Sequence, residues 1–319
     1  ATATITSIFS DVSRCIIILL SNLIDFTASG ELDNGYTWKY QVQLDDATTL
    51  NDDTRLEIGT DMGTVGFYVS EGGLSSELAY GIGALGTGFD YASTSTFNHS
   101  YDVDSYSNIQ YHLPSGILPL GGSLKLGYVP NMSNTTMVSA KESDSTITSE
   151  ATGRKLEMVS VGLAPIDGLS IKGSAAQTSD ETVTSGPNGK ETGVSANLSA
   201  KYTIGQVSVG YTEGGYQPAV ASGEITYYEN KFYGIQFDVN DAISVSYNVD
   251  KSDKNQRVKV AAGSTTGTKT STEMEQKSIQ LAYTTGGATI GIAQVEVDNA
   301  DYSAGKTETQ SVVSLAISF

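Results

Sequence analysis

The stretch GYTWKYQVQL, residues 35–44, alternates apolar and polar side chains at every second position. This alternation predicts a β-strand with one apolar and one polar face. The same pattern recurs in GTVGFYV (63–69), SANLSAKY (195–202) and DAISVSYNV (241–249). Strands of a soluble sandwich also alternate, so these segments indicate an all-β protein without yet choosing its architecture.

The spacing of the breaks between strands favours a barrel. Short turn signals alternate along the chain with longer polar stretches. The turn signals lie at 33–35, 61–63, 114–119, 165–168, 204–205, 240–241 and 286–287. The longer polar stretches lie at 45–53, 71–106, 130–152, 178–190, 213–224, 251–272 and 298–307. All six prolines fall in these connections, as ladder hydrogen bonding requires. With strands granted near 1–9 and 24–32, the count is about sixteen, an even number with short turns at one end and long loops at the other. The sequence therefore predicts a 16-stranded antiparallel transmembrane β-barrel, one domain over residues 1–319.

Aromatic residues fit two girdles at the membrane boundaries. If the apolar faces meet lipid, five aromatic residues fall near the turn side: Tyr36, Tyr202, Phe237, Tyr283 and Phe319. Three more fall near the loop side: Tyr128, Tyr211 and Tyr247. Aromatic rings favour both interfaces of a membrane barrel, although they also favour strands in general.

Composition narrows the functional classes. The formal net charge is −18, which disfavours nucleic-acid binding because phosphate contacts need a basic surface. The single cysteine, Cys15, cannot form an intramolecular disulfide. No apolar run reaches the ~18–20 residues of a membrane-spanning helix. The strongest run, CIIILLSNLI at 15–24, is expected to be an anomalous strand or loop, and the opening ATATITS reads as the start of a mature chain after signal removal.

Three segments carry a family resemblance. The end VSLAISF (313–319), closing on Phe319, resembles the C-terminal signal by which outer-membrane barrels are recognised for assembly. The stretches DDTRLEIGTDMGTVGFYV (52–69) and SNIQYHLPSG (107–116) resemble alphaproteobacterial porins, within the general porin family of Gram-negative bacteria. The resemblance covers 26–129 and 308–319 and is architectural between them. Residues 10–25 depart from it, because a first external loop should be polar.

The resemblance implies a passive outer-membrane channel for ions and small hydrophilic solutes, without a cofactor. It implies a homotrimer in contact with outer-membrane lipid, lipopolysaccharide and the barrel-assembly machinery. It also implies that the third loop, 71–106, folds into the barrel as a constriction. That loop holds five acidic residues and no lysine or arginine: Glu71, Glu77, Asp90, Asp102 and Asp104.

A basic wall is expected opposite this loop. Its members on predicted inner faces are Lys39, Arg55, Lys125, Lys172 and Lys201, with Arg154 as a further candidate. Opposed charges across a narrow gap would filter solutes by size and charge, with a modest cation preference from the acidic excess. The plainer interpretation is that both sets are ordinary solvated charges.

Other functions have weaker support in the sequence. Histidine-based catalysis has only His99 and His112 to use, with His112 beside Asn108 and Gln110, and no nucleophile elbow is present. The glycine-containing stretches 81–88 and 263–269 lack the strand–helix context of a phosphate loop. A calcium site is conceivable in the acidic loop that holds Asp45, Asp46, Asp52 and Asp53, although EF-hand spacing is absent. A surface adhesin or array protein and a barrel-borne hydrolase remain the alternatives.

Overall fold

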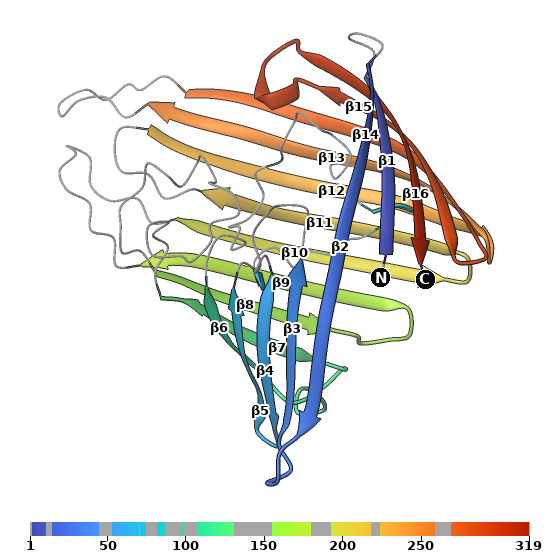
Figure 1. Cartoon of the computed structure of the whole chain (residues 1–319). Helices are drawn as coiled ribbons and strands as arrows, with labels where there is room; N and C mark the ends of the chain where they lie inside the picture. The colour runs from blue at the N-terminus through green and yellow to red at the C-terminus, as the bar shows by residue number, and fades with distance from the viewer. Residues whose placement is uncertain are drawn as a thin grey trace, which may run out of the picture.

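The computed structural model describes residues 2–10, 15–44, 53–69, 71–74, 82–86, 97, 107–130, 155–179, 193–217, 224–258 and 269–318. Almost all of these residues lie in antiparallel β-strands (Figure 1). No helix in this part of the chain is long and apolar enough to cross a membrane. The prediction of an all-β antiparallel protein is confirmed.

The strands differ widely in length. Their bounds are β1 Thr2–Ser10, β2 Cys15–Glu31, β3 Thr37–Leu44, β4 Thr54–Thr60, β5 Gly63–Val69, β6 Asn108–His112, β7 Ser123–Val129, β8 Lys155–Leu163, β9 Leu169–Ser179, β10 Val194–Ile204, β11 Val207–Gln217, β12 Glu224–Asn240, β13 Ile243–Val258, β14 Lys269–Thr285, β15 Ala288–Asp298 and β16 Thr307–Ser318. A short 3₁₀ turn, η2 Ala300–Tyr302, lies between β15 and β16.

Each strand pairs with its neighbours in sequence, and the first strand also pairs with the last. Thr2 lies opposite Ser318 and Ser10 lies opposite Gln310 in the β1–β16 ladder, while the other edge of β1 pairs with β2. The order of hydrogen-bonded neighbours therefore passes through every strand and returns to its start, as in a barrel. In such an order every strand has a neighbour on each side, and β2 pairs with β1 along residues 15–23 and with β3 along residues 24–31.

Short connections recur at one end of the sheet as the sequence predicts, although ten residues join β6 to β7 there. Two-residue connections join β4 to β5, β10 to β11, β12 to β13 and β14 to β15. The last of these is Gly286-Gly287, and both glycines have positive φ, 54° and 85°. A tight hairpin turn of the primed type needs this backbone conformation, which glycine adopts without a steric penalty. The connections at the opposite ends of the strands run from four residues, between β1 and β2, to 38, between β5 and β6.

The apolar run at 15–24 forms the first part of β2, so the strand interpretation is correct and the loop interpretation is wrong. The strand expected near 24–32 begins nine residues earlier, at Cys15, and pairs with β1 and then with β3. Residues 15–24 therefore belong to the first hairpin and do not form the polar external loop that the family resemblance implies. Their β-branched and leucine side chains suit a strand, which resolves the anomaly.

The predicted loops at 213–224 and 251–272 are too long, because strands occupy six of the 12 residues in the first stretch and 12 of the 22 in the second. β11 continues to Gln217, and β13 and β14 pair as far as Arg257 opposite Lys269. These stretches are polar on both faces, which hides them from a search for alternating hydrophobicity. Outward-facing ion pairs support them instead, including Lys251–Glu275 between β13 and β14. A strand that extends into water can carry such charges at little cost.

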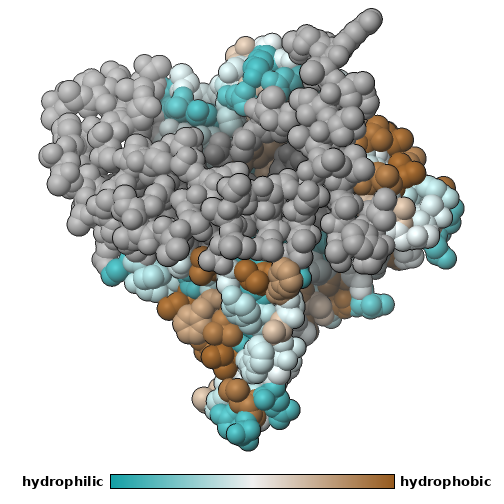
Figure 2. Space-filling view, viewed as in Figure 1, coloured by the Kyte–Doolittle hydropathy of each residue, from teal (hydrophilic) through white to brown (hydrophobic). Residues whose placement is uncertain are grey.

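The two faces of the sheet differ sharply. One face exposes large apolar side chains, including Leu198 and Ile279 at 60% each, and Phe26 at 55%. Apolar patches of this kind are visible on the outside of the molecule (Figure 2). The alternate positions are small or polar and buried, such as Asn197 and Ser199. An apolar outer face and a polar inner face are expected of a barrel surrounded by lipid.

The aromatic residues predicted for the turn side are outward or exposed where the structure describes them. Phe237 and Tyr283 are 41% and 39% exposed, and Tyr202 is half-buried on β10. Tyr36 lies just before β3 and is exposed, whereas Phe319 lies outside the described residues. At the loop side, large exposed rings include Tyr128, Tyr211 and Tyr247. The girdle itself stays a prediction.

Adjacent residues of β12 provide a test of the two faces. Ile235 points outward and is 47% exposed, while Gln236 points inward and donates a hydrogen bond to Asp238 at 2.7 Å. Ile235→Arg is expected to lower the free energy of unfolding by about 2–4 kcal/mol, because it places a charge against lipid. Gln236→Arg is the matched control and should fold normally. Urea unfolding from lipid vesicles measures both, and equal effects would contradict the assigned faces.

Candidate functional site

The inner wall is lined by polar side chains that are almost completely covered. On strands β10, β11, β13 and β14 this face carries Asn197, Ser199, Thr212, Asn248, Ser278 and Gln280, each at most 6% exposed. Cross-strand partners continue the face from strand to strand, for example Ser199 opposite Thr212 and Ser246 opposite Gln280. Parts of the connection between β5 and β6 contribute to this cover at several points on the inner wall, and they define the candidate site.

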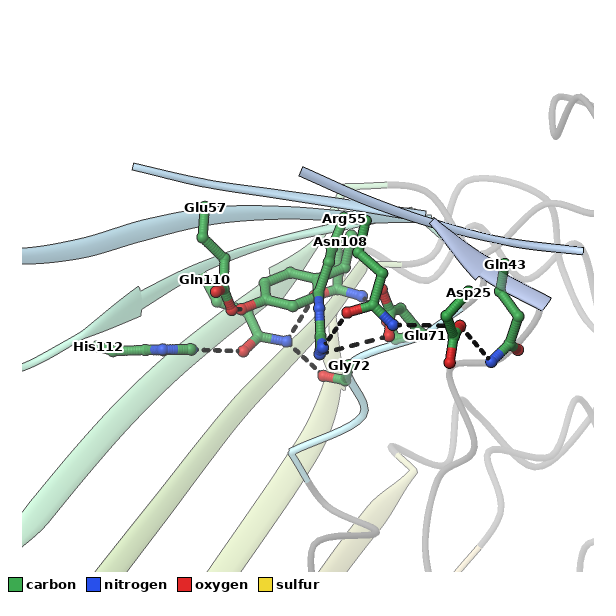
Figure 3. A network of polar contacts seen from close by, with 11 residues as sticks. Asp25, Gln43, Arg55, Glu57, Glu71, Gly72, Asn108, Gln110 and His112 are labelled. Atoms are coloured by element: carbon green, nitrogen blue, oxygen red, sulfur yellow. Dashed lines mark hydrogen bonds and ion pairs between the residues drawn. The ribbon is translucent and has the colours of Figure 1, made fainter. Parts of the chain in front are cut away.

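The start of this connection is held by a polar network on β4, β5 and β6 (Figure 3). Asn108 Nδ2 donates to the Glu71 carbonyl oxygen at 2.7 Å, and Gln110 Nε2 donates to the Gly72 carbonyl oxygen. The Glu71 carboxylate lies 3.7 Å from the Arg55 guanidinium. These contacts turn the chain inward as it leaves β5.

The charges in this network lie on β4 and just after β5. Tyr68 donates through its hydroxyl to Glu57 at 2.7 Å, while Arg55 also donates to Gln41. Burial raises the pKa of Glu71, and the nearby Arg55 charge opposes that rise. Glu71 is therefore a partly desolvated carboxylate whose ionised form depends on Arg55.

A second contact lies on the far side of the barrel. The Ala84 backbone N–H donates to Ser246 Oγ at 2.8 Å, and the Leu85 backbone N–H donates to Gln280 Oε1 at 2.9 Å. A Cβ at Gly83 would collide with the Gly86 carbonyl oxygen and with Gln280, so glycine is required for this close approach. Residues 82–86 therefore lie against the inner face of β13 and β14.

Two apolar clusters inside the barrel hold further parts of the same connection. Leu74, 1% exposed, packs in a cluster with inward residues of β7, β8, β9, β11 and β12: Val129, Leu156, Met158, Ala176, Tyr216 and Tyr228. Phe97 packs in a second cluster with Phe232, Met274, Val295, Val297 and Ala300. The Phe97 and Phe232 rings meet edge to face, with their centroids 5.8 Å apart. Burying apolar groups here holds the connection to the wall.

Five of the six predicted basic residues are described, and the strand registers place them on one continuous face. Lys39 and Arg55 lie on β3 and β4, opposite Glu57 and Gln41. The other three lie further along the same inner face: Lys125 on β7, Lys172 on β9 and Lys201 on β10. All five are half-buried. Arg154 lies outside the described residues.

Of the predicted acidic loop residues, the structure describes Glu71 alone and brings it to Arg55. Glu77, Asp90, Asp102 and Asp104 lie outside the described residues. Their placement opposite the basic wall stays a prediction.

The described residues contain no group of three or more His, Cys, Asp or Glu side chains placed to hold a metal ion. Asp45, Asp46 and Asp52 of the acidic loop lie outside them. The Asp53 carbonyl oxygen accepts a hydrogen bond from the Gln43 backbone N–H at 2.8 Å. His112 Nε2 lies 2.8 Å from Gln110 Oε1, within the polar network that holds the loop, and His99 is not described.

The apolar residues inside the barrel are absent from the sequence-based predictions. A detectable signal exists in KLEMVSV (155–161), where Leu156 and Met158 point inward beside an outward Glu157. Another lies in YYENKFYG (227–234), where Phe232 points inward beside an outward Lys231. In both segments the usual order of apolar outside and polar inside is reversed. Such a reversal marks the places where a loop packs on the inner wall.

No family profile and no curated protein matches the chain. Solved structures do match along its whole length. A loop L8 deletion form of OmpT, an outer membrane protein of Vibrio cholerae, aligns at a TM-score of 0.66 and 13% identity over 99% of this chain and 96% of that one. An anion-selective porin from Comamonas acidovorans aligns at 0.66 and 13% over 100% and 98%. A mutant of the Rh. blastica porin aligns at 0.59 and 17% over 100% and 98%. The chain has the fold of the outer-membrane porins.

The contacts at residues 82–86 can be tested by removing their acceptors. Each lost hydrogen bond costs about 1 kcal/mol, so Ser246→Ala with Gln280→Ala is expected to open this segment at least about tenfold more often. Limited proteolysis of the folded protein, followed by mapping of cuts within 71–106, measures the opening. The matched control is Gln294→Ala, which removes a hydrogen bond from Ser311 on the outer face. An unchanged cleavage rate in the double variant would contradict the contact.

Proposed function

We propose that this protein is an outer-membrane porin, a water-filled channel for passive diffusion of ions and small hydrophilic solutes. The observation that carries the proposal is the contact of Ala84 and Leu85 with the inner faces of β13 and β14. It supports a loop that begins after β5 and folds into a barrel with an apolar outer wall. The fold of the solved porins supports the same function. Passage through such a channel needs no chemical step and no cofactor.

In this proposal the chain forms a 16-stranded transmembrane barrel, and residues 71–106 form its constriction. The loop narrows the lumen and presents Glu71, Glu77, Asp90, Asp102 and Asp104 toward the basic wall. Charges of opposite sign across a narrow gap produce a transverse field that favours small polar solutes over apolar ones. The Arg55–Glu71 pair at the root of the loop fixes one edge of this arrangement.

The acidic excess of the chain is the basis for a modest cation preference. The net charge of −18 raises the local concentration of cations at the channel mouths. A structure with the same fold is described as an anion-selective porin, so the fold alone leaves selectivity open. The charges of this chain must decide it. Salt should weaken the preference, since exposed charges are screened over ~8–10 Å at 0.1–0.15 M ionic strength.

The same proposal places the protein in the outer membrane of a Gram-negative bacterium as a homotrimer. Another solved structure of the same fold is described as a trimer form, which supports the assembly. Outer-membrane lipid and lipopolysaccharide would surround the apolar face, and Phe319 would act in recognition by the barrel-assembly machinery. The adhesin and hydrolase alternatives have no specific contact in their favour among the described residues.

The channel can be tested by reconstitution into planar lipid bilayers. Stepwise ohmic conductance is expected, with a reversal potential in a KCl gradient that indicates cation preference and grows as salt is lowered. Asp102→Asn with Asp104→Asn should shift the reversal potential toward anions without abolishing conductance. A charge-matched control is Asp33→Asn with Asp61→Asn, which removes two carboxylates from exposed connections at the turn side.

Two outcomes of this experiment would count against the proposal. Repeated absence of conductance from correctly folded protein would contradict the channel itself. A reversal potential that responds equally to both double variants would contradict the role of 71–106 as the constriction.

A further inference from the structure

The connection between β15 and β16, residues 299–306, has a compact and braced shape. The Ala300 backbone N–H donates to the Lys306 carbonyl oxygen at 2.9 Å, and the Gly305 N–H donates to Asn299 Oδ1 at 2.8 Å. The Lys306 ammonium lies 2.6 Å from Asp301 and 2.8 Å from Glu308. These two partners raise the pKa of Lys306 to about 12, so the lysine stays charged in neutral solution.

This connection does not stay above its own hairpin but reaches across three neighbouring strands. Asn299 donates through its side chain to the Glu273 carbonyl oxygen on β14 at 2.8 Å. The Tyr302 hydroxyl lies 2.7 Å from Ser252 Oγ on β13. The Tyr302 ring lies 5.3 Å, centroid to centroid, from the ring of Tyr228 on β12. Ser252 and Tyr228 point inward, so Tyr302 lies inside the barrel.

Tyr302 packs against both apolar clusters that hold the β5–β6 connection. One cluster contains Leu74, near the start of that connection, and the other contains Phe97, nearer its end. Ala300, in the same turn, is completely buried in the second cluster. The connection between β15 and β16 therefore packs against the two clusters that hold the start and the later part of the β5–β6 connection.

The backbone of the turn is held in a conformation that side chains disfavour. Asn299, Asp301 and Tyr302 have φ of 52°, 54° and 56°, in the left-handed region. Non-glycine residues adopt this region seldom, and surrounding contacts must hold them there. The contacts at Ser252, Tyr228 and Lys254, whose ammonium lies 5.7 Å from the Tyr302 ring centroid, provide that restraint.

We propose that Tyr302 helps to set the size of the channel, in addition to the constriction formed by 71–106. Tyr302 does so by holding the β5–β6 connection in place through the two apolar clusters. The proposal rests on the porin function above and adds a residue outside the predicted constriction. The Tyr302 ring takes up space at the inner wall, and it keeps Leu74 and Phe97 seated. Its removal should therefore widen the lumen and loosen the connection together.

The test compares three substitutions at this position with a control in the same turn. Tyr302→Ala should increase the relative uptake of a disaccharide over a monosaccharide, in liposome swelling, by at least about twofold. It should also speed cleavage within 71–106 at least about fivefold. Tyr302→Phe keeps the ring and should resemble the native protein, while Tyr302→Leu should be intermediate. Ser303→Ala changes an exposed side chain and is the control.

The readouts separate this proposal from the porin function. If native protein forms channels but Tyr302→Ala, or Tyr302→Leu if the alanine variant does not fold, changes neither uptake nor cleavage, the role of Tyr302 is wrong. If native protein forms no channels, the porin function is wrong, and cleavage still reports whether Tyr302 holds the connection. Circular dichroism and heat-dependent mobility in gels identify the variants that have folded.

Discussion

The pairing of β1 with β16 is the contact on which the remaining architecture depends. Lipid offers no hydrogen-bonding partners, so every backbone N–H and C=O group of a spanning strand must find its partner within the sheet. Once Thr2 lies opposite Ser318, every strand has a neighbour on each side, and the strands can present apolar side chains outward. Closure also creates an enclosed inner face. Loops that pack there are held by contacts with the wall on several sides.

Period-two alternation was sufficient to predict the sheet, the turn side and most strand positions, because the outer face carries apolar residues such as Leu198 and Ile279. It failed where that selection is absent. The extended parts of β13 and β14 carry polar residues on both faces, and their strands are supported by pairing and ion pairs that no local pattern reveals. The run at 15–24 was ambiguous because its residues are apolar on both faces.

The candidate site was predicted in outline but not in its mechanism of support. The sequence indicated a long acidic connection and basic wall positions, and Arg55 and Glu71 do meet. What could not be predicted is how the connection is seated, because its partners are far away in sequence. Leu85 meets Gln280 and Phe97 meets Phe232, and only the closed sheet brings them together. The local sign of these distant contacts is that Leu156 and Phe232 are apolar residues at inward positions, where polar residues are usual.

The unequal strand lengths give the barrel an oblique rim. The strands β12 to β14 have 16–17 residues and β4 to β7 have five to seven (Figure 1). At about 3.3 Å per residue, the first group extends roughly 55 Å and the second roughly 15–25 Å. The hydrogen-bonded sheet therefore reaches more than twice as far along β12 to β14 as along β4 to β7, and the described strands end at different heights on the two sides of the barrel.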